Sequence, residues 1–459
     1  MDLRLEEVQD FTSFPGVEYD DKNQRGYFGA IANANQGVSV VPMYRVPLTP
    51  AASLGDWTAS NLITSSQFPR VNYPLGNSFA NPLIPSDQIY STSPMGTMKV
   101  LDHSYLMNAA LWDSYYFSTA CNYNSAAFTT KATKADVLSK FFSGEKPMLN
   151  SRLSPFLADS GDAQSVSGSY ALKSDLEFSK TFAKNAMIQG AFNINSDSVD
   201  AWRAVLSSLR DASVKGYANQ DIAVVEKTAF VRNGLPVAGS ADDANPTNSV
   251  NALGQIRWAG FRALTDKQIE NLANLIIAEI RASSILDSGP CLCVADFVNR
   301  RPGSSNSLHS QKGILQSAID KSTINNNDDF HGKDSLSITG NSLPANRTTG
   351  LLNKEALDGF TGDGAPPMLT QGDLLTGLAP IITARGDTFT IRSYGESRAA
   401  NGTSVVARAW CEATVQRIPA FIDETDKPEA LTSDLNPTNR AFGRKFIVVS
   451  FRWLDQSEI

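Results

Sequence analysis

The clearest pattern of apolar and polar positions lies in the stretch 190–209. Ser196 or Asp197 can accept hydrogen bonds from the unpaired amide groups of a first helical turn. Apolar side chains then recur at helical spacing on one face, at Val199, Trp202, Val205, Leu206 and Leu209. This pattern predicts a capped amphipathic helix that packs against a core.

The helix with the best-marked start is expected at 265–280. Thr265 and Gln268 have the spacing of a capping box, and Leu264 and Ile269 are placed for a hydrophobic staple. Its predicted buried face consists of Ile269, Leu272, Ile276 and Ile280. Other helices are expected near 102–116, 134–142, 291–301, 313–319 and 370–378.

The last hundred residues change from helical to alternating periodicity. Strands are expected at 388–396, 405–416 and 446–453, with Asn401-Gly402 as a hairpin turn and Pro419 ending the second strand. The second strand places Val405, Ala407, Ala409, Cys411, Ala413 and Val415 on one face. The pattern predicts an antiparallel meander that buries one face against helices.

Together these segments predict an α+β fold, in which a helical region packs with the terminal meander and long irregular loops connect the elements. Three consecutive regions are expected. Residues 1–160 form an irregular or mixed lobe with an edge strand at 38–46, residues 161–366 are helical with a mobile loop near 321–366, and residues 367–459 form the meander.

Charge and length exclude some classes of protein. The 459 residues carry 40 Lys and Arg against 47 Asp and Glu, a net charge of −7, which argues against a broad nucleic-acid-binding face. No run approaches the ~20 apolar residues of a membrane span. Asp2, Glu6 and Glu7 do not fit a signal peptide, so we expect any export or anchor segment to lie outside this chain.

No catalytic residue is predicted. His103, His309 and His331 lie in three different segments, and none pairs with a carboxylate at a recognisable catalytic spacing. Nucleophile-elbow, metalloprotease and phosphate-loop motifs are absent from the sequence. We therefore expect a protein that is not an enzyme and has no cofactor.

Cysteine and carboxylate patterns leave two alternatives open. Cys291 and Cys293 are predicted to be buried free thiols, and a Cys121–Cys411 bridge is the alternative use of the other two. Calcium is the one metal worth testing, although solvated loops are the simpler explanation of every oxygen-rich cluster. The three clusters are Asn193, Asn195 and Asp197; Asn327, Asp328, Asp329 and Asp334; and Asp358 with Asp363.

The order of several short motifs resembles known envelope proteins. Ala191-Phe192-Asn193-Ile194-Asn195 before a helix, the segment 290–297, and the strand ends Phe389-Thr390-Ile391 and Val415-Gln416-Arg417 resemble the minor pseudopilin K proteins of type II secretion. A resemblance over most of the chain is to the Verru/Chthon cassette protein A family, encoded beside prepilin-like proteins. Its motifs are 53–55, 73–80, 102–105, 110–113, 295–301, 369–371, 391–396, 407–412 and 444–453.

This resemblance implies a non-enzymatic structural component of a pilus-like or type II secretion-like apparatus, acting by protein–protein packing at the periplasmic or extracellular face of the cell envelope. Its implied partners are other pilin-like subunits, and membrane attachment would come only through a segment missing from this chain. Two alternatives stay open. One is a binding module for an extracellular polysaccharide, using the aromatic residues of 105–116, and the other is an enzyme of unrecognised type.

Overall fold

The computed structural model confirms the α+β class, with helices and antiparallel strands in the same chain. It describes residues 17–20, 25–28, 50–58, 60, 75–92, 96–112, 117–123, 132–157, 161–189, 192–215, 221–232, 261–287, 290–303, 307–325, 337–338, 350–360, 368–400, 402, 404–428 and 430–459. The chain forms two compact units, residues 1–119 with 194–384 and residues 120–193 with 385–459. The units therefore interleave, whereas the sequence predicted three consecutive regions.

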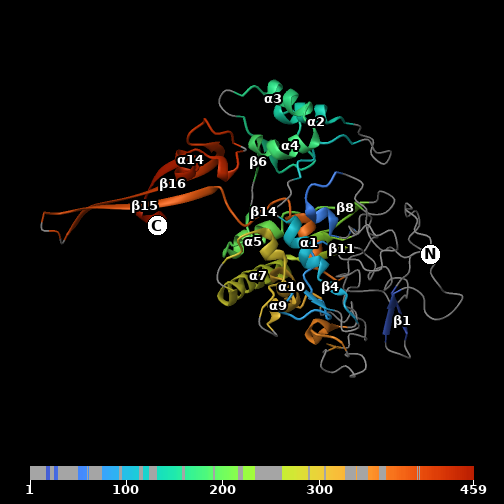
Figure 1. The fold of residues 1–459 in the computed structure, drawn as a ribbon. Coiled ribbons are helices and arrows are strands. Elements are labelled where there is room, and N and C mark those ends of the chain that lie inside the picture. Colours follow the sequence, from blue (N-terminus) through green and yellow to red (C-terminus); the bar gives the residue numbers. More distant parts are fainter. Residues whose placement is uncertain are drawn as a thin grey trace. The chain divides into compact units, whose positions relative to one another are not determined.

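The first unit is mainly helical (Figure 1). Its helices are α1 (His103–Leu111), α5 (Val199–Leu206), α7 (Asp266–Asp287), α8 (Val294–Val298), α9 (Leu308–Gln311), α10 (Ile314–Lys321) and α13 (Gln371–Leu378), with 3-10 turns at Leu54–Trp57 and Lys354–Leu357. Its strands are β1 (Val17–Asp20), β2 (Arg25–Phe28), β3 (Tyr90–Thr92), β4 (Lys99–Leu101), β8 (Val214–Lys215), β9 (Asp221–Ile222), β10 (Lys227–Val231), β11 (Phe261–Thr265), β12 (Ser337–Ile338), β13 (Gly359–Phe360) and β14 (Ile382–Thr383).

The core of this unit forms around α7, which contacts α5, α10 and β11. The predicted capping box is present, because Gln268 N donates to Thr265 Oγ1 at 3.3 Å and Thr265 N donates to Gln268 Oε1 at 2.9 Å. The predicted apolar face is buried at Ile269, Leu272, Ile276 and Ile280. Local sequence signals therefore place this helix correctly.

The helix at Trp202 forms, but its ends differ from the prediction. Ser198 is the N-cap, accepting from Ala201 N, whereas Ser196 accepts from Ser198 N before the helix begins. The helix ends at Leu206, so Leu209 lies outside it and is exposed. Trp202 is fully buried, stacks on Phe297 with ring centroids 5.9 Å apart, and donates from Nε1 to Ser196 O.

The second unit contains a helical part and a sheet. Its helices are α2 (Lys134–Phe142), α3 (Ala163–Ala171), α4 (Asp175–Thr181) and α14 (Pro437–Phe442), with 3-10 turns at Phe182–Asn185, Thr432–Asp434 and Gln456–Glu458. Its strands are β5 (Leu153–Pro155), β6 (Ala186–Ile188), β7 (Phe192–Asn193), β15 (Thr388–Arg398), β16 (Val405–Phe421) and β17 (Arg444–Leu454). Rings of Phe141, Phe142, Tyr170, Phe178 and Phe182 pack together in the core of the helical part.

The three-stranded sheet β15-β16-β17 is the predicted antiparallel meander. The β15–β16 hairpin extends as a long ribbon beyond α14 (Figure 1). Pro419 was predicted to end β16, but the strand continues to Phe421. Pro419 lies where the register to β17 shifts between Arg417 and Phe421, a position in which a missing ladder donor is tolerated.

The predicted burial of one face of the meander against helices is wrong. Every residue of β15 and most of β17 is exposed, and within the sheet only the ends at Phe421 and Leu454 are buried. Period-two alternation specifies two faces of a sheet but cannot specify what covers them. The consequence is a sheet with both faces open to solvent.

Several predictions fall on residues outside the description, namely the strand at 38–46, most of the loop at 321–366, and His331. Of the turn at 401–402, only Gly402 is described. It adopts a φ of 71°, which suits the predicted hairpin turn. Among the helices of the described ranges, none combines the length and apolar character that a membrane span requires.

Candidate functional site

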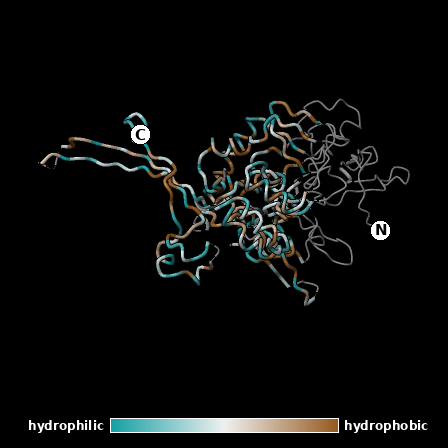
Figure 2. Tube along the Cα trace, turned by 90° about the horizontal axis from the view of Figure 1, so that it is seen from above, coloured by the Kyte–Doolittle hydropathy of each residue, from teal (hydrophilic) through white to brown (hydrophobic). Residues whose placement is uncertain are grey.

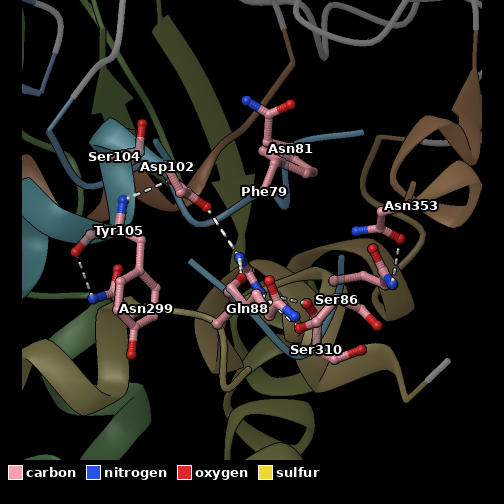
Figure 3. Close-up of polar contacts among 12 residues, drawn as sticks. Phe79, Asn81, Ser86, Gln88, Asp102, Ser104, Tyr105, Asn299, Ser310 and Asn353 are labelled. Carbon is pink, nitrogen blue, oxygen red and sulfur yellow. Dashed lines mark hydrogen bonds and ion pairs between the residues drawn. The ribbon is translucent and has the colours of Figure 1, made fainter. Parts of the chain in front are cut away.

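The polar motif residues of the first unit meet in a buried hydrogen-bond network. The Arg300 guanidinium lies 3.2 Å from the Asp102 carboxylate, and the two side chains are 1% and 6% exposed. Arg300 also donates to the backbone oxygens of Ser86, Gln88 and Ser310 at 2.8–3.3 Å (Figure 3). Asp102 caps α1 with its other oxygen, which accepts from Tyr105 N. The pair therefore fixes the start of α1 to the segments 86–88 and 300–310.

Two asparagines extend this network. Asn108 Nδ2 donates to Asn299 Oδ1 at 2.9 Å and to Asn77 O at 2.8 Å, while its Oδ1 accepts from Gly76 N. Asn299 Nδ2 in turn donates to Tyr105 O at 3.1 Å (Figure 3). These bonds join the segments 76–77, 102–108 and 299–300, which carry three of the motifs quoted above. Buried polar groups of this kind stabilise one particular chain arrangement, so these motifs specify the fold.

A second buried cluster contains a histidine that the sequence analysis did not pair. His309 Nε2 lies 2.9 Å from Glu279 Oε2, and Lys321 Nζ lies 2.5 Å from Glu279 Oε1. Burial raises the pKa of Glu279, but hydrogen bonds from His309 and Lys321 outweigh burial and hold that pKa below its usual value. The His309 and Glu279 side chains are 7% and 3% exposed, whereas Lys321 is 46% exposed, so the cluster links α7, α9 and α10 and reaches solvent at Lys321.

The only advance signal for this pair is Glu279 itself. It interrupts an otherwise apolar helix face, and a carboxylate in that position needs a partner. The partner, His309, is 30 residues further along the chain, beyond any local spacing rule. His103 occupies the first position of α1, next to the cap Asp102, as a capping-region residue.

The predicted oxygen clusters do not converge in the described residues. The side-chain amide of Asn195 forms two hydrogen bonds with the backbone of Cys291, donating to its O and accepting from its N at 2.9 Å each. Asp197 is exposed and lies 3.7 Å from Arg281. Within the described ranges no group of three His, Cys, Asp or Glu side chains is arranged to hold a metal ion. Asp363 and the four residues of the 327–334 cluster lie outside those ranges.

The four cysteines are free thiols, so the Cys121–Cys411 bridge is not formed. Cys291 is buried as predicted, while Cys293 is only partly buried and therefore differs from the prediction. Burial raises the pKa of the Cys291 thiol to about 11, although the Arg301 guanidinium 3.7 Å from the sulfur favours the thiolate. Cys291 is therefore protonated and unreactive at neutral pH.

The aromatic residues proposed for polymer binding serve the interior of the first unit. The Arg300 guanidinium lies over the Tyr105 ring, 5.6 Å from its centroid. Trp112 is buried and donates from Nε1 to Asn108 Oδ1 at 3.2 Å. Residues 113–116 lie outside the description. Of these two aromatic side chains, Tyr105 is partly exposed and Trp112 is buried.

Exposed apolar side chains gather instead on one face of the β15-β16-β17 sheet, which we term the apolar face. Strand register places on it Phe389 and Ile391 of β15, Ala413 and Val415 of β16, and Phe446, Phe451 and Trp453 of β17. Phe389 and Phe446 approach to 5.9 Å between centroids, and Phe451 meets Trp453 edge-on at 5.5 Å. Figure 2 shows hydrophobic residues recurring along this ribbon.

The opposite face of the same sheet, termed the charged face, has a different chemistry. Glu412 of β16 accepts from Arg392 of β15 at 2.7 Å and from Arg452 of β17 at 3.0 Å. These two hydrogen bonds hold the pKa of Glu412 below its usual value, and the bond from Arg392 has the larger effect. The charged face thus combines paired charges with the Tyr394–Trp410 ring pair and Ile447, whereas the apolar face leaves most of the large apolar side chains of the sheet in water. Such an uncovered patch is the usual mark of an interaction surface.

Comparisons with known proteins returned no match to any family model, any curated protein or any solved structure.

Proposed function

We propose that this chain is a non-enzymatic structural component of a pilus-like or type II secretion-like envelope assembly, and that it acts by protein–protein packing through the apolar face. The observation that carries the proposal is the contrast between the two faces of one sheet. The charged face is internally paired, while Phe389, Ile391, Phe451 and Trp453 on the other face are 42–69% exposed. Burying such residues is the main favourable term in association.

One further observation supports an assembly role over a catalytic one. The polar residues of the motifs at 76–80, 102–108 and 299–300 are engaged by one another and by backbone groups inside the first unit. The pilus-like setting, the location at the cell envelope and the prepilin-like partners rest on the motif order in the sequence. The apolar face gives this proposal a definite surface to test.

The test is affinity isolation of the full-length tagged protein from cell envelopes. Three versions are compared: the natural sequence, Ile391→Glu on the apolar face, and Thr390→Glu on the charged face. Positions 390 and 391 are neighbours on one exposed strand, so the two variants carry the same charge change at similar exposure. We expect prepilin-like subunits to be recovered with the natural protein and with Thr390→Glu, and lost with Ile391→Glu. Equal recovery with both variants, or with neither the natural protein nor its variants, contradicts the proposal.

A further inference from the structure

The apolar face has two halves that differ in side-chain size, and the row of Ser393 in β15 and its partner Cys411 in β16 separates them. The tip half lies toward the turn between β15 and β16, and the base half lies toward the other end of this hairpin. The base half carries the large side chains Phe389, Ile391, Phe446 and Phe451, while Trp453 lies on the dividing row itself, opposite Cys411. The tip half carries only small ones, which are Gly395, Ser397, Ala407 and Ala409. A Cβ added at Gly395 would meet nothing within 4 Å, so the surface there is bare.

We propose that a second copy of this chain covers the apolar face, with the strands of the two copies antiparallel and the base half of each over the tip half of the other. This inference rests on the proposed assembly function and names one partner for its surface. The two-fold axis that generates this arrangement runs between the two sheets, across the strands at the level of Ser393 and Cys411. Two-fold pairs of identical patches are the commonest form of oligomer.

The relief of the face matches itself under this operation. Ile391 lies two residues from Ser393 on the base side and Gly395 lies two residues away on the tip side, so Ile391 of one copy fills the bare surface over Gly395 of the other. Phe389 meets Ser397 of the second copy by the same count. Along β15, large side chains thus pack against small ones at both ends, as interdigitating sheet faces require. Trp453 lies on the dividing row and meets Trp453 of the second copy across the axis.

Charge and area agree with a second copy as the occupant. Each chain carries a net charge of −7, but the Arg392–Glu412–Arg452 ion pairs lie on the charged face and point away from the contact. Arg417, at the base end of the apolar face opposite Phe446, is paired with Asp387. Phe389, Ile391, Phe446, Phe451 and Trp453 are 42–69% exposed. With about 200 Å² per large side chain they contribute roughly 500 Å² per copy. Two copies therefore bury about 1,000 Å², the lower limit of a specific interface.

Sedimentation velocity of the purified full chain at micromolar concentrations gives the first test. We expect the natural protein and Thr390→Glu to form a concentration-dependent dimer. Ile391→Glu should weaken that dimer by about tenfold or more, because a carboxylate would be buried without a partner. A protein that is monomeric throughout, or a dimer unaffected by Ile391→Glu, overturns the inference.

The Ala409→Trp variant distinguishes the proposed base-over-tip arrangement from a nonspecific hydrophobic contact. Ala409 lies on the tip half and is exposed, so the larger side chain has room in the single copy, and circular dichroism checks that the fold is kept. Added apolar area would strengthen a nonspecific contact. In the proposed arrangement the indole collides with the base half of the second copy, so we expect the dimer to be lost. A dimer of unchanged or greater strength overturns the base-over-tip arrangement.

Cys411 is a natural reporter for the axis. Packed sheets lie about 10 Å apart, so the two Cys411 thiols should be joined by a bis-maleimide of that span. We expect a crosslinked dimer from the natural protein and none from Cys411→Ser, which changes one atom. Crosslinking that persists in Cys411→Ser contradicts the position of the axis.

The same variants distinguish failure of this inference from failure of the proposed function. A monomeric chain that still recovers envelope partners through an Ile391-dependent contact overturns the second copy as occupant and leaves the assembly function standing. A dimer that recovers no prepilin-like subunit supports this inference and contradicts the pilus-like setting. A monomer that recovers no partner overturns both.

Discussion

The side chains of Gln316 and Gln371 each accept a hydrogen bond from the other residue's backbone. Gln316 N donates to Gln371 Oε1 at 3.1 Å and Gln371 N donates to Gln316 Oε1 at 3.0 Å, which fastens the start of α13 to α10. Gln371 Nε2 donates further to Gly76 O and, at 2.9 Å, to Val298 O. A single buried amide thus satisfies backbone groups from three other segments of the first unit.

Replacing Gln371 by Leu should destabilise the first unit. The change keeps the volume but leaves several buried backbone groups without partners, at about 1–3 kcal/mol for each group. We expect a loss of about 3 kcal/mol in the free energy of unfolding, measured by denaturant titration. Asn274→Leu, at an exposed position of α7, is the control, and it should change the free energy by no more than about 0.5 kcal/mol. Equal effects of the two variants would show that the amide pair contributes nothing.

Replacing Arg300 by Leu should be among the most damaging single changes in the first unit. It leaves the Asp102 carboxylate buried without its counter-charge, and removal of one partner of such a pair costs about 3–5 kcal/mol. Arg300→Lys should restore little, because an ammonium cannot serve three separate backbone oxygens and Asp102 together. The control is Arg203→Leu, which breaks an exposed ion pair and should cost at most about 1 kcal/mol. Full stability of Arg300→Leu would contradict this account.

Stability of the first unit should fall in acid through Glu279. Its pKa is lower in the folded chain than in the unfolded one, so the unfolded state binds the proton more tightly. The contribution of Glu279 is therefore present above the unfolded pKa of about 4.3 and is lost as the pH falls through the folded pKa. We expect Glu279→Gln to flatten the fall in unfolding free energy between about pH 5 and pH 3. Glu270→Gln, at an exposed position of the same helix, should leave the fall unchanged.

The thiols should differ in their rate of alkylation. Cys291 is buried with a pKa of about 11, so little thiolate forms at neutral pH and reagents have poor access to it. Cys411 is half-buried on the apolar face. We expect mass spectrometry of the folded protein after brief iodoacetamide treatment to find Cys411 modified and Cys291 unmodified. Modification of Cys291 first would contradict its burial.

Local signals in the sequence predicted the helices and strands. They could not predict contacts between residues that are far apart in the chain. Thr265 and Gln268 are three residues apart, so the start of α7 could be inferred from the chain alone. The partners Gln316 and Gln371 are 55 residues apart and have no pattern that announces them. The same limit applies to His309 and Glu279, which only the packed helices bring together.

The sheet shows a second kind of limit. Alternation from Val405 to Val415 correctly predicted a strand with an apolar and a polar side. It did not predict that the apolar face would stay open, because the same pattern suits a face covered by helices. The motif resemblance likewise selected segments around Asp102 and Arg300 that prove to specify the fold. Identifying a surface therefore required coordinates.

The interleaving of the two units has a consequence for biosynthesis. Residues 385–459 leave the ribosome after the whole of the first unit and after the aromatic cluster at 141–182. Since chains emerge from the N-terminus and domains fold as they appear, the β15-β16-β17 sheet forms after the first unit. The proposed contact through the apolar face therefore becomes available only after the first unit has had time to fold.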